Sequence, residues 1–357
     1  MPTRDSATGA RRLPSWPFVT AYSLPAIHLL GMHLRGPWLW LLPVYVFVGV
    51  PVFDRLIGDW RTEPEETGAR RAIFDRLLEL WLPMELCVLG WTLLQVTEQP
   101  LSAGEWLPFA LSTGLVTGGG GITVAHELIH RPGRFHRALG EALMTVVLYA
   151  HWCVEHVVGH HRRVGTSEDA ATARRGESIY AFLVRCIPAG FASAWRLEAR
   201  RVEREPGFGW LADRRLRYPL TQLGLVAFVG LLLGPVALAA FLAQAVIAIW
   251  LLEVVNYVEH YGLVRELRPD GRPERVRPHH SWNSNAALSG AILFLVTRHS
   301  HHHAEASKPY DRLQAMPEAP MLPAGYPTMM LLALVPPLWF RVMDPRVAAV
   351  RRKSQAA

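Results

Sequence analysis

Histidines gathered in four short clusters are the feature of this sequence best able to carry chemistry. Ten of its 16 histidines lie in these clusters. The clusters run from His126 to His130, from Glu155 to His161, from Asn256 to Gly262 and from Arg298 to His303. Imidazole binds iron, copper, nickel and zinc, so the clusters predict a transition-metal site without naming the metal.

The spacing within the clusters is typical of metal ligands on helices. His126 and His130 are four residues apart, so both imidazoles would lie on one face of a helix. His156 and His160 repeat this spacing, and His161 would point about 100° away, toward a second metal or the same one. The HExxH zinc proteases share the local pair, but four clusters supply more imidazoles than one tetrahedral zinc can bind. The set therefore fits two metals better than one.

A metal also explains why so many histidines stand together. In the fourth cluster, His299 precedes His302 by three residues and His303 by four. Crowding and burying such groups without a metal would cost free energy and create repulsion on protonation. His28 and His33, which stand apart in the first apolar block, are better explained as satisfied interior or interfacial groups.

Three glutamates directly precede clustered histidines: Glu127, Glu155 and Glu259. Consecutive residues on a helix do not face each other, so each glutamate would orient a histidine of another cluster or pair with an arginine. The sequence leaves these two roles open. Asn256 and His301, inside the third and fourth clusters, are further candidates for contacts around the ligands.

Composition and charge indicate a membrane protein. Half of the residues are apolar, and the mean hydropathy is +0.14. The net charge of +7 comes from arginines that flank apolar blocks, a pattern typical of cytoplasmic loops rather than of a nucleic-acid-binding surface. The three cysteines have no paired spacing, so neither a disulfide framework nor a cysteine-ligated metal is supported.

The apolar residues form blocks long enough to cross a membrane. These blocks cover residues 17–35, 37–53, 76–97, 105–125, 138–154, 217–233 and 236–257. Turn residues at Gly36, Ser102 to Gly104 and Gly234 divide six of the blocks into three hairpins, which predicts six crossings. The remaining block, 138–154, must be re-entrant or interfacial if the clusters on both sides of it share one site.

The arginines predict the orientation of these crossings. They gather at Arg61, Arg70 and Arg71, between 162 and 217, and between 265 and 277. These loops and both termini are therefore expected in the cytoplasm, on the side where all four clusters lie. The predicted organisation is a cytoplasmic tail (1–16), one membrane-embedded domain (17–344) and a flexible tail (345–357). The segment Pro327 to Phe340 is expected to dock at the interface, because Pro336 and Pro337 interrupt it.

The clusters resemble those of the membrane-bound alkane 1-monooxygenases, within the integral-membrane fatty acid desaturase and hydroxylase group. The similar segments are HELIHR at 126–131, EHVVGHH at 155–161, NYVEHYGL at 256–263 and RHSHHH at 298–303. The resemblance extends to TSEDAATARRGESIY at 166–180, HSWNSN at 280–285 and the closing segment 322–347. The NYxEHYGL box distinguishes this family from ordinary desaturases.

This resemblance implies an all-α enzyme of six membrane-spanning helices with a cytoplasmic, histidine-rich di-iron cap, in the inner (cell) membrane of a bacterium. One oxygen atom of dioxygen would be inserted into the terminal methyl of a medium- or long-chain alkane taken from the bilayer. The family receives electrons from rubredoxin and its reductase, and because this chain has no CxxC pair, the donor would be a separate protein. The implied iron ligands are His126, His130, His156, His160, His161, His260, His299, His302 and His303.

Two residues depart from the family pattern. The family usually has Asp where this chain has His301, and Lys where it has Arg131. Arg131 keeps the positive charge, whereas His301 removes a carboxylate beside the implied ligands. In the family, a bulky residue about two turns before an Asp that matches Asp54 can limit the depth of the alkane channel. Val46 stands at that offset and predicts a deeper channel, which would favour longer alkanes.

Two other enzymes and one transporter are alternatives. A fatty acid desaturase, or a monooxygenase that attacks an aromatic methyl group as xylene monooxygenase does, would use the same metals on a different C–H bond. A divalent metal transporter would need ionisable groups near the middle of several crossings. The clusters lie on one side, which disfavours transport.

Overall fold

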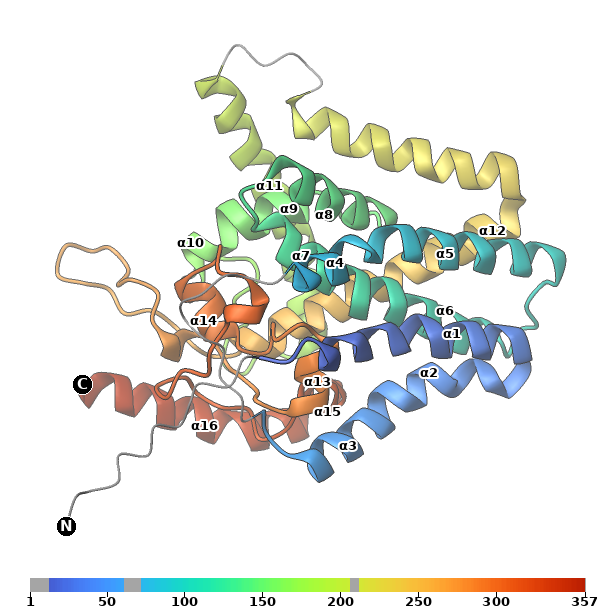
Figure 1. The fold of residues 1–357 in the computed structure, drawn as a ribbon. Helices are drawn as coiled ribbons and strands as arrows, with labels where there is room; N and C mark the ends of the chain where they lie inside the picture. Colours follow the sequence, from blue (N-terminus) through green and yellow to red (C-terminus); the bar gives the residue numbers. More distant parts are fainter. Residues whose placement is uncertain (1–12, 61–71, 206–211, 357) are drawn as a thin grey trace.

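A computed structural model describes residues 13–60, 72–205 and 212–356, and within them the chain is helical, without a β-strand. The first half contains η1 (Trp16–Tyr22), α1 (Ser23–Leu34), η2 (Gly36–Trp40), α2 (Leu41–Val44), η3 (Tyr45–Gly49), α3 (Val50–Ile57), α4 (Ile73–Glu79), α5 (Trp81–Glu98), α6 (Trp106–Gly114), η4 (Leu115–Ile122), α7 (Thr123–Ile129) and α8 (Arg134–Val146). The second half contains α9 (Trp152–Val154), η5 (Glu155–His160), α10 (His161–Arg163), α11 (Ile179–Arg204), α12 (Arg214–His260), η7 (Pro278–His280), α13 (Ala287–Ile292), α14 (His299–Ala304), η8 (Tyr310–Arg312), α15 (Tyr326–Ala333) and α16 (Pro336–Ala356). Figure 1 shows the elongated bundle that these helices form.

Four stretches of the described chain are long and apolar enough to cross a membrane. They are Gly36–Ile57, Ile73–Glu98, Trp106–Ile129 and Arg214–His260. The last contains 47 residues and is divided by Gly234, whose φ of 84° breaks the helix into the arms 214–233 and 235–260. The first predicted block forms η1 and α1, which lie beside α2 (Figure 1).

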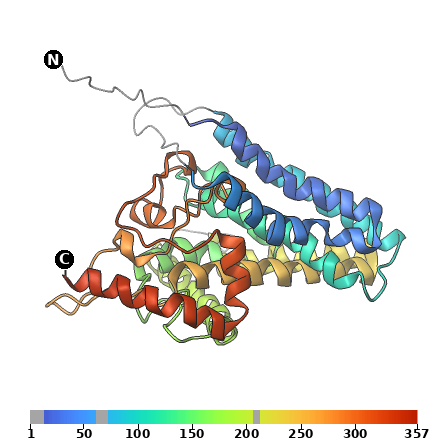
Figure 2. The same ribbon diagram turned by 90° about the horizontal axis from the view of Figure 1, so that it is seen from below.

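The three predicted turns meet at one end of the bundle (Figures 1 and 2). The backbone N–H of Gly36 donates to Glu105 Oε1 over 2.9 Å, and the guanidinium of Arg35 donates to the carbonyl of Gln99. The hydroxyl of Thr97 lies 3.4 Å from the carbonyl oxygen of Leu233. The chain therefore folds into the three hairpins that the sequence predicts. Their other end carries the histidines.

The apolar block 138–154 does not form a spanning helix. It is divided between α8, which has 13 residues, and α9, which has three, with Leu148 at a φ of 57° between them. The indole of Trp152, in α9, is buried among α7 and α8 in one hydrophobic cluster. The chain thus returns to the same end of the bundle, as the shared site requires.

The C-terminal region departs from the predicted flexible tail. Residues 345–356 continue helix α16, and 326–333 form the separate helix α15 before it. Asp344 accepts a hydrogen bond of 2.7 Å from the hydroxyl of Tyr261, and Arg351 donates one of 2.9 Å to the carbonyl of Gly262. These bonds fasten α16 to the end of α12. The predicted loop arginines Arg61, Arg70 and Arg71 lie outside the described residues.

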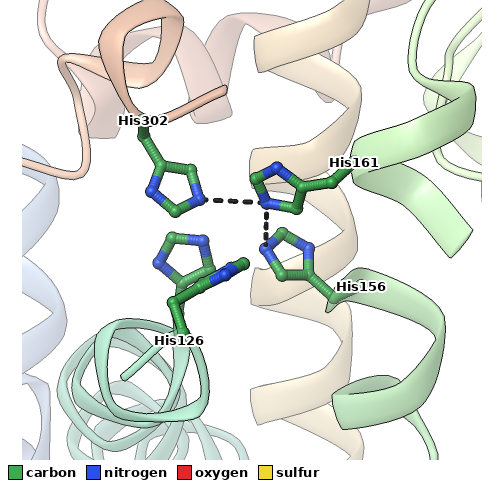
Figure 3. A group of neighbouring side chains, drawn as sticks. His126, His156, His161 and His302 are labelled. Atoms are coloured by element: carbon green, nitrogen blue, oxygen red, sulfur yellow. Dashed lines mark hydrogen bonds between the residues drawn. The ribbon is translucent and has the colours of Figure 1, made fainter. Parts of the chain in front are cut away.

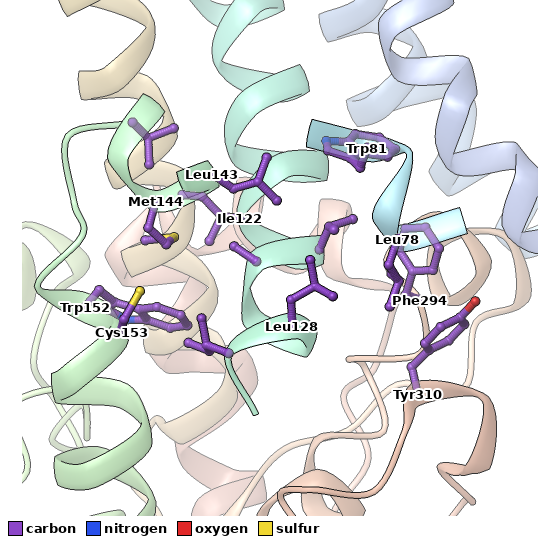
Figure 4. Close-up of a cluster of buried hydrophobic side chains, with 14 of the residues drawn as sticks. Leu78, Trp81, Ile122, Leu128, Leu143, Met144, Trp152, Cys153, Phe294 and Tyr310 are labelled. Atoms are coloured by element: carbon purple, nitrogen blue, oxygen red, sulfur yellow. The ribbon is translucent and has the colours of Figure 1, made fainter. Parts of the chain in front are cut away.

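The largest hydrophobic cluster joins the helical bundle to the segment that carries the last histidine cluster (Figure 4). Trp81 of α5, Leu128 of α7 and Trp152 of α9 belong to it. Phe294 and Tyr310, which flank α14 in the sequence, pack their rings 5.1 Å apart in the same cluster. Burying aromatic rings on both sides of α14 fixes this short helix against the bundle.

The glycine run at 118–121 allows close packing inside the bundle. A Cβ atom on Gly118 would lie 2.7 Å from Cα of Ala248, and one on Gly120 would lie 2.1 Å from the ring of Trp81. Gly119 differs, since its nearest neighbour would be Leu115 Cδ2 at 3.9 Å. A Cβ atom on Gly121 would likewise clash with the side chain of Glu85. Three glycines of the run therefore allow close packing, and Gly119 faces open space.

Candidate metal centre

Five of the nine predicted ligands form the five-histidine group. Its members are His126 in α7, His130 directly after α7, His156 in η5, His161 at the start of α10 and His302 in α14. One ring nitrogen from each lies within 4.8 Å of all the others. Figure 3 shows the rings turned toward a common centre, with Nε2 of His161 3.1 Å from Nε2 of both His156 and His302.

The remaining four predicted ligands form the four-histidine group. His160 ends η5, His260 ends α12, and His299 and His303 both lie in α14. Nε2 of His299 is 3.1 Å from that of His260 and 3.0 Å from that of His303. All four side chains are buried. The structure thus brings the nine histidines together as two adjoining groups.

The pairing in the second sequence cluster differs from the predicted one. His156 and His160 were expected to share a face, as residues four apart on an α-helix do. Residues Glu155–His160 instead form a π-helix, whose wider turn pairs a residue with the fifth one along. His156 therefore shares a group with His161, and His160 faces the other group.

The two groups fit bound metals better than they fit hydrogen-bonded histidines. Nε2 of His161 faces two other Nε2 atoms, although a neutral imidazole nitrogen offers one proton or one lone pair. The Nε2 atoms of His130 and His160 are buried without a hydrogen-bond partner among the described residues. At a metal–nitrogen distance of about 2.1 Å, ligands at right angles are about 3.0 Å apart and tetrahedral ligands about 3.4 Å. The separations of 3.0 to 3.1 Å are therefore short enough for these nitrogens to bind one metal.

Burial keeps these histidines in the form that binds metals. It lowers the pKa of His130 to about 3, and the proximity of His160 adds to this effect. Burial and neighbouring imidazoles also hold the pKa values of His156 and His302 well below 6.5. Neutral imidazoles at neutral pH present the lone pairs that a metal requires.

An apolar cavity inside the bundle ends at the two groups. It has an empty volume of about 920 Å³, part of which is open to the surroundings. His126 and His156 of one group and His299 of the other line it. The remaining wall is almost entirely apolar and includes Val46, Phe47, Val50, Leu115, Gly119, Leu251, Leu252, Ile292 and Met330. Such a cavity suits a hydrocarbon ligand that extends away from the metals.

Comparison with known proteins supports one family. The fatty acid desaturase family model matches residues 104–333. Alkane 1-monooxygenase 2 of Pseudomonas aeruginosa is 42% identical over 333 residues, which are 90% of this chain and 87% of that protein. Alkane 1-monooxygenase of Ectopseudomonas oleovorans is 38% identical, over 90% of this chain and 83% of its own. This chain belongs to the alkane 1-monooxygenase family.

A more distant relative has a different name. The hydroxylase component XylM of the xylene/toluene monooxygenase of Pseudomonas putida is 28% identical, over 90% of this chain and 86% of its own. The alkane 1-monooxygenases therefore resemble this chain more strongly than the aromatic-methyl enzyme does.

One carboxylate that the sequence did not single out contacts a predicted ligand of this alkane 1-monooxygenase family member. Asp169 Oδ2 lies 2.9 Å from Nδ1 of His160 and accepts a 2.6 Å hydrogen bond from the hydroxyl of Thr172. Burial alone would raise the pKa of Asp169, but these two neighbours lower it overall. The proton on Nδ1 leaves Nε2 of His160 free for a metal. In the sequence, Asp169 was indicated only by its position in the segment 166–180, which resembles the alkane 1-monooxygenases.

Two of the three glutamates pair with arginines, which is one of the roles left open by the sequence. Glu127 pairs with Arg131 at 2.6 Å, and Glu155 pairs with Arg163 at 2.7 Å. Glu259 instead lies beside a histidine of another cluster, with Oε2 3.3 Å from Nε2 of His299. Its other oxygen accepts a 2.9 Å hydrogen bond from the hydroxyl of Tyr326, at the metal end of the cavity.

Asn256 and His301 occupy different positions. Asn256 lines the cavity and donates a 3.0 Å hydrogen bond to Glu253. His301 belongs to neither histidine group. Its Nδ1 accepts a hydrogen bond of 2.8 Å from the backbone N–H of Gln314, and its Nε2 lies 3.0 Å from the Lys308 ammonium. The ring therefore faces away from the metal ligands.

A third set of potential ligands has an internal explanation. Glu274, His279 and His280 lie near one another and belong to neither of the two histidine groups. The backbone N–H of Arg277 donates to Nδ1 of His280, so Nε2 of this neutral ring carries the proton and faces Glu274 Oε1 at 3.2 Å. The Arg277 guanidinium also pairs with Glu274 at 3.4 Å. These contacts satisfy Glu274 and His280 without a metal.

Proposed function

We propose that this chain hydroxylates the terminal methyl group of medium- or long-chain alkanes, with dioxygen and two irons bound by its nine clustered histidines. The observation that carries the proposal is an apolar cavity of about 920 Å³ that ends at both histidine groups. The family's relatives named as alkane 1-monooxygenases support the same substrate class. Iron held there would supply the activation of dioxygen that an unactivated C–H bond requires.

The residues of the chain bind and orient the alkane. Its chain lies against apolar side chains from η3, η4, α12 and α15, where each buried methylene contributes about 0.8 kcal/mol. The terminal methyl points toward His126, His156 and His299, the histidines that line the cavity. Tyr326 holds Glu259 beside Nε2 of His299, on the side of the ring where a metal would bind.

The proposal places the centre on the cytoplasmic side of six crossings in a bacterial inner membrane. Three hairpins whose turns lie at one end support six crossings, and the arginine-rich loops at the other end support the orientation. Residues 17–344 would form one membrane-embedded domain around the site. A substrate that partitions into the bilayer then enters sideways, between the helices that line the cavity.

Electrons come from a separate protein in this proposal, namely rubredoxin with its reductase. The chain has three cysteines, all free in the structure, and no CxxC pair. It therefore lacks the paired cysteines with which a protein could bind its own iron–sulfur centre or rubredoxin-type iron.

Metal analysis and an oxidation assay test the proposal together. Purified protein is expected to contain about two irons per chain, since two ligand groups are present. With octane or hexadecane, rubredoxin, reductase and NADH, it should form the primary alcohol. Near-stoichiometric zinc without iron in active protein would refute the metal assignment.

Product analysis also decides between this function and its two enzymatic alternatives. An alkene formed from a fatty acyl chain would indicate a desaturase, the enzyme for which the matched family model is named. A benzylic alcohol formed from xylene, without product from octane, would indicate the activity named for the XylM relative. Either result would change the assigned substrate from an alkane to another compound. The histidine groups would remain the proposed metal site.

Single substitutions test the two groups separately. His126→Ala removes one member of the five-histidine group, and His160→Ala removes one member of the four-histidine group. Each change is expected to lower iron to about one per chain or less and to abolish alcohol formation. His279→Ala, a histidine outside both groups, is the matched control and should keep both irons. Full iron in both group variants would argue against the ligand assignment.

A further inference from the structure

A second pocket, the rear pocket, reaches both histidine groups and differs from the apolar cavity in chemistry. His156 of one group and His160 of the other line it, and its empty volume is about 320 Å³. Trp152, His156 and Asn256 line both spaces and therefore separate them. The other rear-pocket residues are Tyr149, His151, Glu155, Ala170, Ala171, Cys186, Gly190 and Glu253.

A hydrogen-bonded carboxylate makes one wall of the rear pocket polar. Glu253 is 2% exposed. Its Oε1 accepts from the hydroxyl of Tyr149 at 2.9 Å, and its Oε2 accepts from Cys186 Sγ at 3.1 Å and from the Asn256 amide at 3.0 Å. The apolar cavity has no comparable set of polar groups among its described lining residues away from the metal end. Water is therefore more stable in the rear pocket than in the cavity.

An ion pair links the rear pocket to an open polar pocket at the surface. Arg163 and Ser193 line this surface pocket, together with Glu168, Arg196, Leu197 and Arg200. The Arg163 guanidinium donates to Glu155 Oε1 and to Ser193 Oγ, each at 2.7 Å. Glu155 lines the rear pocket on the other side of this contact. A continuous line of polar groups thus leads from the surface to both histidine groups.

The rear pocket has the polarity and size that internal water requires. Glu155 Oε2 is buried without a hydrogen-bond partner among the described residues, and such oxygens normally bind water. The empty volume of about 320 Å³ includes space open to the surroundings, and the enclosed part has room for about one ordered water.

We propose that the rear pocket is the water path of the reaction, through which protons reach the metal centre and product water leaves. The inference rests on the proposed function. There, alkane, dioxygen, two electrons from the redox partner and two protons give one alcohol and one water, so one oxygen atom enters the C–H bond and the other is reduced to water. An alkane that fills the apolar cavity blocks that route for both water and protons. The rear pocket remains open to them while substrate is bound.

Labelling of two cysteines tests for water in the unmodified chain. Cys186 lines the rear pocket, whereas Cys153 packs in the large hydrophobic cluster, and their exposed fractions are 4% and 5%. Hydroxyl radicals produced by X-ray irradiation arise from water and oxidise sulfur next to it. Cys186 is expected to be oxidised several-fold faster than Cys153 in the full-length, iron-loaded protein. Equal protection of the two cysteines would overturn the proposal.

Filling the rear pocket tests its role in turnover. A Cβ atom on Gly190 would have only Glu155 Cγ nearby, at 3.9 Å, so Gly190→Leu extends into the pocket without a backbone clash. The variant should keep its iron, lose alcohol formation several-fold, and show a larger solvent isotope effect in D₂O because proton delivery limits its rate. Gly190→Ala and Ala181→Leu, the latter exposed on the same helix, are the matched controls. Unchanged turnover and isotope effect in Gly190→Leu would contradict the water path.

A second variant that fills the rear pocket, together with the wild-type assay, distinguishes failure of the water path from failure of the proposed function. Ala171→Leu fills the rear pocket from another segment and should reproduce the effects of Gly190→Leu, with iron content showing that each variant has folded. If the wild-type protein forms no alcohol from alkane, the proposed function fails, while cysteine labelling still reports on the water. If wild type is active but both filled variants equal it, only the water path fails.

Discussion

At the scale of single residues, the departure of His301 from the family pattern has a local explanation. Its Nδ1 accepts from the backbone of Gln314, and its Nε2 lies beside Lys308 and 3.3 Å from Glu305. An aspartate at this position would offer acceptors to both Gln314 and Lys308. The side chain therefore stabilises the segment after α14 rather than binding the metals.

His301→Asp is accordingly expected to preserve or raise alcohol formation with an unchanged iron content. Iron analysis and the octane assay measure the two effects. His303→Asp, two residues along in the four-histidine group, should lose iron and serves as the contrast. Loss of iron in His301→Asp would identify His301 as a ligand.

Asp169 provides a second prediction at this scale. Asp169→Asn removes the charge that holds the Nδ1 proton of His160, so this ring would bind its metal about 10- to 100-fold more weakly. Iron remaining after titration with a chelator measures the change, which should affect one iron of the two. Glu168→Gln changes the neighbouring exposed carboxylate and should leave both irons in place. Identical chelator curves for the two variants would show that Asp169 does not support the metal.

The sequence predicts the nine histidines but not the division between them. Their residue type and their helical spacing are local properties, which a sequence displays directly. The assignment of His156 and His161 to one group depends on a π-helical turn, and that of His302 depends on how α14 packs. Asp169 has no local pattern at all, because its partner is defined only when the loop after α10 folds back.

At the scale of elements, π-helical turns recur where helices approach the site. They occur at η3, η4 and η5, and residues of all three line the apolar cavity. Each adds a residue to a helical turn and so shifts which side chains face inward. At η3 this brings Val46 and Phe47 to the cavity together, whereas the next residue, Val48, is 56% exposed.

Val46→Trp should therefore shift substrate preference toward shorter alkanes. A methylene that no longer fits forfeits about 0.8 kcal/mol of binding, or about fourfold in affinity. The ratio of products from mixed octane and hexadecane measures the shift, with iron content as a check on folding. Val48→Trp adds the same bulk outside the cavity and should leave the ratio unchanged. An unchanged ratio in Val46→Trp would mean that another residue sets the depth.

The hairpins were predictable because glycine and proline mark their turns, whereas the helix at the C-terminus was not. The polar, arginine-rich composition of 345–356 is typical of a tail. Helix α16 forms there because Asp344 and Arg351 bond to residues at the end of α12, more than 80 positions earlier. Such long-range contacts leave no periodic signal in the segment itself.

At the scale of the whole molecule, the two ends of the bundle have opposite characters. One end carries three short turns, held together by contacts such as that between Gly36 and Glu105. The other end carries the histidine groups, the rear pocket and the arginine-rich surface pocket. The two proposals together would bring substrate and water to one centre from different phases, the alkane from the bilayer and the water from the arginine-rich side.

Labelling of introduced cysteines tests the orientation that this arrangement requires. Gly104→Cys places a thiol at the turn end, where a Cβ atom has no neighbour within 4 Å, and Asp270→Cys places one in the exposed loop at the histidine end. The stretch Trp106–Ile129 between these ends has 24 residues, so it is about 36 Å long and exceeds the roughly 30 Å of a hydrocarbon core. A membrane-impermeant maleimide should label Gly104→Cys on intact cells, but Asp270→Cys only after permeabilisation, because positively charged loops stay inside. The unsubstituted chain measures labelling of the native cysteines. The reverse pattern would invert the orientation, and labelling of both sites on intact cells would contradict the spanning bundle.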